Sequence, residues 1–294
     1  MARLELSISP ALDGRSVQSL LKYELGLSSS CINRLKRTEC GITANGERVF
    51  TNARLMAGDV LAVDLNAAER LTKVEPVEMP LDIVFEDEHL LILNKNAPLA
   101  VIPSSLVPDE PTLANALAHY MGERFSFHPV NRLDRSTTGL MAVAKNSFIH
   151  DRLQRMLHSG TFCRRYLAVC EGIPEPRSGE ITLPIGRKAG SAVARCIDPN
   201  GQYARSSYRV LEYTERFSLV ELTPHTGRTH QLRLHMSAIG HPLAGDWLYG
   251  TEEPSLIERS ALHAAFLSVQ HPVTGEMIEL AAPLPADMKR LLEL

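Results

Sequence analysis

Asp134 is the residue of this sequence that is best placed to do chemistry. It lies between Arg132 and Arg135, in a segment rich in Ser and Thr that runs into an apolar stretch. A cation within a few ångström favours the charged form of a carboxylate, so we expect this one to be ionised at neutral pH. An ionised Asp can act as a nucleophile or a general base. A surface ion pair or a turn cap would use the same residues, so this segment alone leaves the structural alternative open.

A second polar cluster, residues 222–235, holds three histidines, His225, His230 and His235. A spacing of five residues does not place them on one helical face, and no carboxylate joins them. We therefore expect histidines that are hydrogen-bonded within the fold or that face RNA, and no metal site. Thr229 can cap a helix that begins here.

The net charge of −3 hides a segregation of charge along the chain. Residues 121–240 carry 17 Lys and Arg against 10 Asp and Glu, whereas the rest carries 14 against 24. A chain with this distribution can present a basic surface to a nucleic acid while it stays acidic overall. Chance and solvated faces explain the charge pattern equally well, so the motifs must decide.

Residues 1–66 form a small separate unit by their pattern. Ser16 begins a predicted helix that Gly26 ends, and the sequence Asn45-Gly46 predicts a hairpin before a strand over residues 60–65. The pattern resembles the RNA-binding domain of the ribosomal protein S-four type. A second short helix is predicted after the serines at 28–30. The resemblance implies RNA contacts for three cations of this helix, with a solvated helix face as the alternative: Arg34, Lys36 and Arg37.

Residues 67–80 are polar, contain two prolines and predict a linker. From residue 81 to 294, short strands and helices follow one another without strict alternation. This favours an α+β domain around a mixed, largely antiparallel sheet with flanking helices. The strands are predicted over residues 83–85, 90–93, 140–144, 165–170, 180–183, 206–213 and 219–223, and the helices over 113–120 and from a Ser147 cap to about 158.

Four motifs in this part follow one another in a specific order. They are Arg-Leu-Asp-Arg-Ser-Thr-Thr-Gly-Leu (132–140), Arg-Arg-Tyr-Leu-Ala (164–168), Thr-Gly-Arg-Thr-His-Gln-Leu-Arg (226–233) and Gly-His-Pro-Leu-Ala-Gly-Asp (240–246). Together they resemble the RluA-type pseudouridine synthases from about residue 81 to the C-terminus. The resemblance implies an isomerase that converts uridines of structured RNA, ribosomal or transfer RNA, into pseudouridine.

The resemblance also implies roles for individual residues. Asp134 matches the essential aspartate that attacks the target uridine, and Arg228 matches the arginine that pairs with it. Tyr166 matches the tyrosine that stacks on the flipped base, although a lone tyrosine in this position more often packs in a core. Leu232 matches the aliphatic residue on the other face of the base, and Arg132 matches the arginine that enters the RNA or holds a phosphate.

The sequence departs from the family pattern at three places. Asn131 stands where the family usually has His, and an amide cannot carry charge there; we still expect Asn131 and Arg135 to contact the RNA. Residues 94–98 and 101–103 differ from the family's Asn-Lys-Pro-Ala-Gly and His-Pro. These two variant segments motivate an alternative, a non-catalytic RNA-binding or ribosome-assembly protein that retains the fold.

A third hypothesis, an aspartyl-phosphate hydrolase, rests on the spacing of Asp134, Ser136 and Thr138, but that loop needs a second carboxylate at position 136. We expect no cofactor, because isomerisation needs no redox partner and the chain lacks dinucleotide and Walker motifs. No apolar run reaches the length of a membrane span, the N-terminus lacks a signal-peptide core, and the five cysteines predict reduced thiols. We thus expect a cytoplasmic, monomeric protein.

Overall fold

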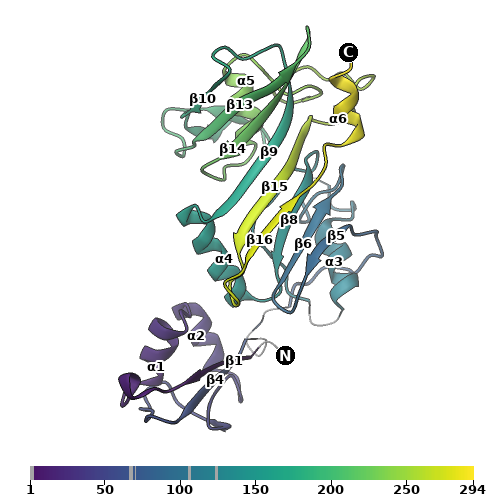
Figure 1. Ribbon diagram of the computed structural model, residues 1–294. Coiled ribbons are helices and arrows are strands. Elements are labelled where there is room, and N and C mark those ends of the chain that lie inside the picture. Colours follow the sequence, from purple (N-terminus) through teal and green to yellow (C-terminus); the bar gives the residue numbers. More distant parts are fainter. Residues whose placement is uncertain (1–2, 66–68, 70, 105–106, 123–124) are drawn as a thin grey trace.

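Two large β-sheets lie on either side of the predicted linker, as Figure 1 shows. The computed structural model describes residues 3–65, 69, 71–104, 107–122 and 125–294. Residues 71–80 carry neither helix nor strand, whereas residues 67, 68 and 70 of the predicted linker lie outside the described residues, as do residues 1, 2 and 66 of the predicted N-terminal unit. We call residues 3–65 the N-terminal module and residues 81–294, which are predicted to carry the chemistry, the catalytic domain.

The N-terminal module packs short helices on a sheet of strand order β1-β4-β2-β3. Side-chain caps from Ser16 and Ser28 start its two helical segments, and Asn45 and Gly46 form the hairpin turn with positive φ angles, as the sequence predicts. The elements are β1 (Arg3–Ser7), η1 (Pro10–Leu12), α1 (Val17–Ser19), η2 (Leu20–Glu24), α2 (Ser29–Leu35), β2 (Ile42–Ala44), β3 (Glu47–Arg48) and β4 (Val60–Asp64).

The catalytic domain is built on a long sheet of strand order β10-β13-β14-β9-β15-β8-β6-β5, with β16 beside β15 and β7 beside β8. β15 runs parallel to β8, and the other described pairs are antiparallel. The elements are β5 (Ile83–Glu86), β6 (Leu90–Lys95), α3 (Leu113–Met121), β7 (His128–Pro129), β8 (Thr138–Ala144), α4 (Ser147–Ser159), β9 (Phe162–Glu171), β10 (Ser178–Ile181), β11 (Ile185–Arg187), β12 (Arg195–Ile197), β13 (Ser206–Tyr213), β14 (Phe217–Pro224), α5 (Gln231–Ala238), β15 (Leu262–Gln270), β16 (Met277–Ala281) and α6 (Ala286–Leu291).

The mixed, largely antiparallel α+β architecture is confirmed, and each predicted strand and helix of this domain has a counterpart. Two predicted helix caps are wrong. Asn146, not Ser147, caps α4, because its side chain accepts a hydrogen bond from the Ile149 N–H. α5 begins after His230, which has a φ of 57°, so Thr229 is not its cap.

The central part of the sheet positions the residues on which the chemistry would depend. The loop after β7 carries Asp134 into β8, β9 carries Tyr166, and α5 carries Leu232 and Arg233. β15 joins these parts, because it pairs with β8 at His263 and with β9 along most of its length. No strand is predicted for residues 262–270, so the sequence analysis missed the strand that joins the two halves of this sheet.

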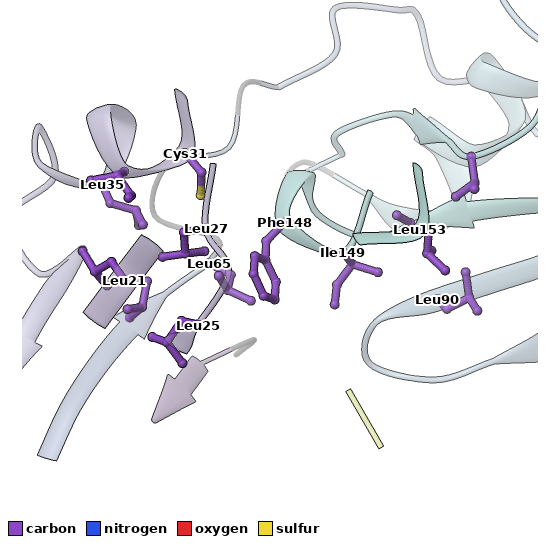
Figure 2. Packing of buried hydrophobic residues seen from close by; sticks show 14 of the residues in the cluster. Leu21, Leu25, Leu27, Cys31, Leu35, Leu65, Leu90, Phe148, Ile149 and Leu153 are labelled. Atoms are coloured by element: carbon purple, nitrogen blue, oxygen red, sulfur yellow. The ribbon is translucent and has the colours of Figure 1, made fainter. Parts of the chain in front are cut away.

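A shared hydrophobic core connects the N-terminal module to the catalytic domain. Phe148, Ile149 and Leu153 of α4 are buried in one cluster with Leu25 and Leu65 of the module. Figure 2 shows Phe148 directed toward Leu65, between the module and the rest of α4. Burial of such side chains stabilises a contact by about 1.5–3 kcal/mol each. The module is therefore docked on the catalytic domain.

Hydrogen bonds at the edge of this core fix the same contact. Arg155 Nη2 donates to the carbonyl oxygen of Gly26 (2.7 Å), and Arg34 Nη2 donates to Ser147 Oγ (2.7 Å). Ser147 also donates from its N–H and its Oγ to Glu69 (2.8 and 2.6 Å). None of the described helices is long and apolar enough to cross a membrane.

Candidate active site

Asp134 is half-buried in the loop between β7 and β8, with 26% of its side chain exposed. The loop is held at both ends. Asn131 Oδ1 accepts a hydrogen bond from the N–H of Ala142 on β8 (2.9 Å), and the N–H of Thr137 donates to the carbonyl oxygen of Asp134 (3.0 Å). The neighbouring Leu133 is buried. The Asp134 carboxylate therefore stands on a backbone that the sheet fixes.

Arg233 is the arginine that contacts Asp134. Its Nη1 lies 3.4 Å from Asp134 Oδ2. The prediction that Arg228 forms this pair is wrong: Arg228 Nε donates to the carbonyl oxygen of Tyr203 (3.0 Å). The two arginines occupy the same motif, but Arg228 precedes α5 whereas Arg233 lies in its first turns. The helix carries Arg233 toward the Asp134 loop.

Asp246 holds the opposite edge of the Arg233 guanidinium. Arg233 Nε and Nη2 donate to Asp246 Oδ2 and Oδ1, each at 2.7 Å, and both side chains are almost fully buried. Asp246 Oδ1 also accepts from the N–H groups of Leu248 and Tyr249 (3.0 and 3.2 Å). A bidentate, charge-assisted pair of this kind fixes the plane of a guanidinium. Asp246 therefore leaves Nη1 facing Asp134.

Tyr249 also supports Arg233 and is itself held by hydrogen bonds. The ring centroid of Tyr249 lies 5.3 Å from Arg233 Cζ. The Tyr249 hydroxyl accepts from the N–H of Arg195 (2.8 Å) and lies 2.9 Å from His230 Nδ1. Burial lowers the pKa of His230, which favours its neutral form. Non-glycine residues with positive φ, as at His230, gather at functional sites.

Tyr166 and Leu232 supply apolar surface at the site. Both are buried in one hydrophobic cluster, which also contains Leu133, the neighbour of Asp134. Burial is the main cause that raises the pKa of Tyr166; the charge of Asp134 raises it further, whereas Arg164 and the nearby Asn131 amide lower it. Tyr166 is thus a neutral phenol at neutral pH, near enough to Asp134 to respond to its charge.

Lys95 is a charged group that the sequence analysis did not single out. It is almost fully buried at the end of β6, and its Nζ donates to the carbonyl oxygens of Asn96 and Leu99 (2.8 and 2.9 Å). Desolvation lowers its pKa to about 7, against a smaller opposing effect of the Asp134 charge. Lys95 Nζ also lies 3.5 Å from the carbonyl oxygen of Arg135. Its ammonium ties the segment after β6 to the loop that carries Asp134.

The other predicted site residues are distributed differently from the expectation. Arg135 does not supply the cation that was expected beside Asp134. It forms a bidentate ion pair with Glu110 instead. Arg132 is exposed. Gln231, which the analysis missed, is buried and holds the loop of Arg228: its Oε1 accepts from the Arg228 N–H (3.0 Å) and its Nε2 donates to Ser206 Oγ (2.9 Å).

The three histidines of this motif each have a partner within the protein. His225 Nε2 lies 2.6 Å from Ser207 Oγ, His230 Nδ1 lies beside Tyr249, and His235 is held between Ser206 Oγ and the carbonyl oxygen of Leu183 (3.0 Å each). Within the part of the chain that the structure describes, no group of three or more His, Cys, Asp or Glu side chains could hold a metal ion.

The three cations of α2 and its end do not act as one group. Arg34 is half-buried and donates to Ser147 Oγ, whereas its contact with RNA stays a prediction. Lys36 and Arg37 are exposed. Spacing along the helix could not separate Arg34 from Lys36 and Arg37, because the contact of Arg34 with Ser147 depends on where α4 docks.

Comparisons with known proteins identify the family to which this chain belongs. A family model described as RNA pseudouridylate synthase matches residues 89–238. The uncharacterized RNA pseudouridine synthase YhcT of Bacillus subtilis is 40% identical over 98% of this chain and 96% of its own. Ribosomal large subunit pseudouridine synthase D of Haemophilus ducreyi is 36% identical over 86% of this chain and 81% of its own.

Solved structures of pseudouridylate synthase domains have a similar fold. Human RNA pseudouridylate synthase domain containing 1 superposes with a TM-score of 0.57 at 31% identity, over 71% of this chain and 86% of that one. The chain therefore belongs to the family of RNA pseudouridine synthases, of the RluA type.

Proposed function

We propose that this protein isomerises uridines of structured RNA to pseudouridine, with Asp134 as the attacking group. The N-glycosidic bond between N1 and the ribose C1′ breaks, the uracil turns while it is held, and C5 bonds to C1′. The proton on C5 then leaves and N1 takes one up, so the product is an isomer of the substrate. Because relatives are named for the large ribosomal subunit, ribosomal RNA is the preferred substrate class, with transfer RNA as the other.

The observation that carries the proposal is the contact of Asp134 with Arg233 next to the cluster of Tyr166 and Leu232. A preorganised cation keeps the carboxylate charged and oriented without solvent rearrangement during the reaction. We assign to Arg233 the pairing role that the family resemblance gave to Arg228. Asp246 and Tyr249 position that cation.

Tyr166 and Leu232 would receive the uracil on its two faces. Stacking on an aromatic ring is worth about 1–3 kcal/mol per base, which offsets much of the cost of extruding a nucleotide. The raised pKa of Tyr166 makes a phenolate base costly at neutral pH. We therefore propose that Tyr166 stacks on the base and offers a hydrogen bond, and that exposed Arg132 contacts the RNA backbone or takes the place of the flipped nucleotide.

The test is the conversion of uridine by purified protein and its Asp134→Asn variant. Bacterial ribosomal RNA and transfer RNA that lack pseudouridine serve as substrates, and mass spectrometry after selective labelling counts the product. We expect Asp134→Asn to bind RNA like the wild type and to form no product. Asp109→Asn, which changes an exposed aspartate, should retain full activity. Product formation by Asp134→Asn would contradict the role of Asp134.

The two alternatives have less support. A non-catalytic RNA-binding protein would not require the buried Arg233–Asp246 pair behind Asp134. An aspartyl-phosphate hydrolase needs a carboxylate at position 136, where Ser136 stands, and the carboxylate of Asp246 contacts the opposite edge of Arg233. RNA that is bound but never isomerised would favour the non-catalytic hypothesis.

A further inference from the structure

A small cavity opens on the N-terminal module, between the end of α2 and the segment that follows β3. Its volume is about 150 Å³. The buried side chains of Leu35 and Ile42 form part of its lining, and Lys36, Arg48, Phe50 and Asn52 contribute polar, cationic and aromatic groups. We call this cavity the Phe50 groove. Leu35 and Ile42 provide apolar surface, and Phe50 provides the face of a ring. Lys36 and Arg48 offer positive charge, and Asn52 offers hydrogen bonds.

Phe50 is the unusual member of this set, because 71% of it is exposed. Arg48 Cζ lies 5.8 Å from the centroid of its ring. In the described part of the chain, neither Lys36 nor Arg48 has a carboxylate within ion-pair distance. An exposed ring with Arg48 beside it, and Lys36 on the same groove, matches the chemistry of a nucleotide, which has a π face and a phosphate.

The backbone that carries Phe50 is ordered before any ligand binds. The N–H of Val49 donates to the carbonyl oxygen of Ile42 (3.2 Å), and the carbonyl oxygen of Thr51 accepts from the N–H of Gln18 (2.8 Å). The carbonyl oxygen of Phe50 itself accepts from the N–H of Ala53 (3.0 Å). A platform that is fixed in this way loses little entropy when a base stacks on it.

We propose that the Phe50 groove binds one unpaired nucleotide of the RNA substrate, with the base stacked on Phe50 and its phosphate beside Lys36 and Arg48. This inference rests on the proposed function, which supplies an RNA as the partner. The core shared with α4 holds the module on the catalytic domain, so the groove and Asp134 belong to one docked unit. The bound nucleotide would then help to select which RNA reaches Asp134.

The first test compares two exposed aromatic residues of the same module. Tyr23 is a matched control, because 67% of it is exposed and Lys22 Nζ lies 5.1 Å from its ring, but it does not line the groove. With a uridine dodecamer and with bacterial ribosomal RNA as probes, Phe50→Ala should weaken binding about five- to hundredfold. Tyr23→Ala should change the affinity less than about twofold, and Phe50→Tyr should bind like the wild type.

Salt dependence separates stacking from charge. Lys36→Ala should reduce the slope of log affinity against log salt by about one, because one phosphate contact is lost, whereas Phe50→Ala should leave the slope unchanged. In Phe50→Trp, the dodecamer should quench the new tryptophan emission in excess of the wild-type change. Equal affinities of Phe50→Ala and Tyr23→Ala, or absent quenching, would overturn the proposal.

Failure of this proposal can be distinguished from failure of the proposed function. If wild-type protein isomerises uridine and Phe50→Ala binds RNA normally, the groove assignment is wrong and the enzymatic function stands. If no RNA is isomerised and Phe50→Ala still weakens binding of the dodecamer, the groove assignment stands and the function is wrong. Binding of neither RNA probe at the groove would leave a protein partner as its occupant and overturn the nucleotide proposal.

Discussion

Arg233 is bound more closely by Asp246 than by Asp134. Two of its nitrogens lie 2.7 Å from the Asp246 carboxylate, whereas a third lies 3.4 Å from Asp134. Because Asp246 and Arg233 are almost fully buried, their attraction is weakly screened. The Asp246 carboxylate thus balances most of the positive charge of the Arg233 guanidinium without a contribution from Asp134. In the proposed function, Asp134 gains an oriented cation that does not form a short ion pair with it.

Asp246→Asn should therefore slow the chemical step without weakening RNA binding. The amide cannot hold both Arg233 nitrogens, so the guanidinium is free to turn toward Asp134 and neutralise it more fully. Misplacement of a catalytic group by about 1 Å can cost roughly 10²-fold, and we expect a loss of that order in the single-turnover rate at saturating enzyme. The affinity for RNA, measured by filter binding, should stay within about twofold.

A second arginine pair in the same chain, of buried Arg259 with half-buried Asp287, provides the control. Arg259 Nε and Nη2 donate to Asp287 at 2.7 and 2.9 Å, and its Nη1 faces backbone carbonyl groups such as that of Leu262. Asp287→Asn should lower the melting temperature as Asp246→Asn does, but it should leave the rate of the chemical step unchanged. If both variants slow the reaction equally, Asp246 has only a structural role.

Substitution of the two arginines of the third motif tests which one pairs with Asp134. Arg233→Lys replaces a planar fork with a point charge that cannot span Asp246 and Asp134, so the single-turnover rate should fall at least 10²-fold. Arg228→Lys removes only a hydrogen bond to the Tyr203 carbonyl and should change the rate by less than about fivefold. The reverse order of the two effects would restore Arg228 to the role that the sequence resemblance gave it.

The local elements were predictable because their signals lie within a few residues of one another. Ser16, Ser28 and the Asn45-Gly46 turn act on their own backbone neighbours, and each appears where the sequence indicates. Asn146 shows the limit of such signals. Both Asn146 and Ser147 have side chains that can cap a helix. Asn146 caps α4, whereas Ser147 donates to Glu69 in the predicted linker.

The relationships that define the site depend on long-range packing, which spacing along the chain does not reveal. Arg228 and Arg233 stand five residues apart, and their directions are set by the start of α5 at His230 and by Asp246, a residue of the next loop. β15 was missed although it joins the two halves of the sheet. The contact of Arg34 with Ser147 was also missed, because only the docking of α4 reveals it.

The docked module gives a third prediction. Phe148 of α4 is fully buried in the core that α4 shares with the module. Truncation of such a side chain costs about 3–5 kcal/mol. Phe148→Ala should therefore loosen the module, and calorimetry should resolve a separate transition at lower temperature, with protease cleavage within residues 71–80. Phe217 is equally buried but belongs to another cluster, so Phe217→Ala should lower the main transition without freeing the module. A single transition for Phe148→Ala would contradict the docking.

The buried ammonium of Lys95 makes the stability of the protein depend on pH. Its pKa is about 7 in the folded protein and about 10.4 in an unfolded chain, so the unfolded state binds more protons between these values. The free energy of unfolding should thus rise with pH through this window, by up to about 1.4 kcal/mol per pH unit from this group. Below pH 7 both states are protonated, and the cost of burying the charge is present in full.

Lys95→Met isolates this effect, because all the other titratable groups are present in both proteins. Urea unfolding should show that the stability of the wild type relative to Lys95→Met increases from pH 7 to pH 9.5. Lys289 is exposed on α6, so the same comparison with Lys289→Met should be flat. A flat difference for Lys95→Met as well would mean that Lys95 keeps its charge in the folded protein, and that Asp134 then has a second buried cation close by.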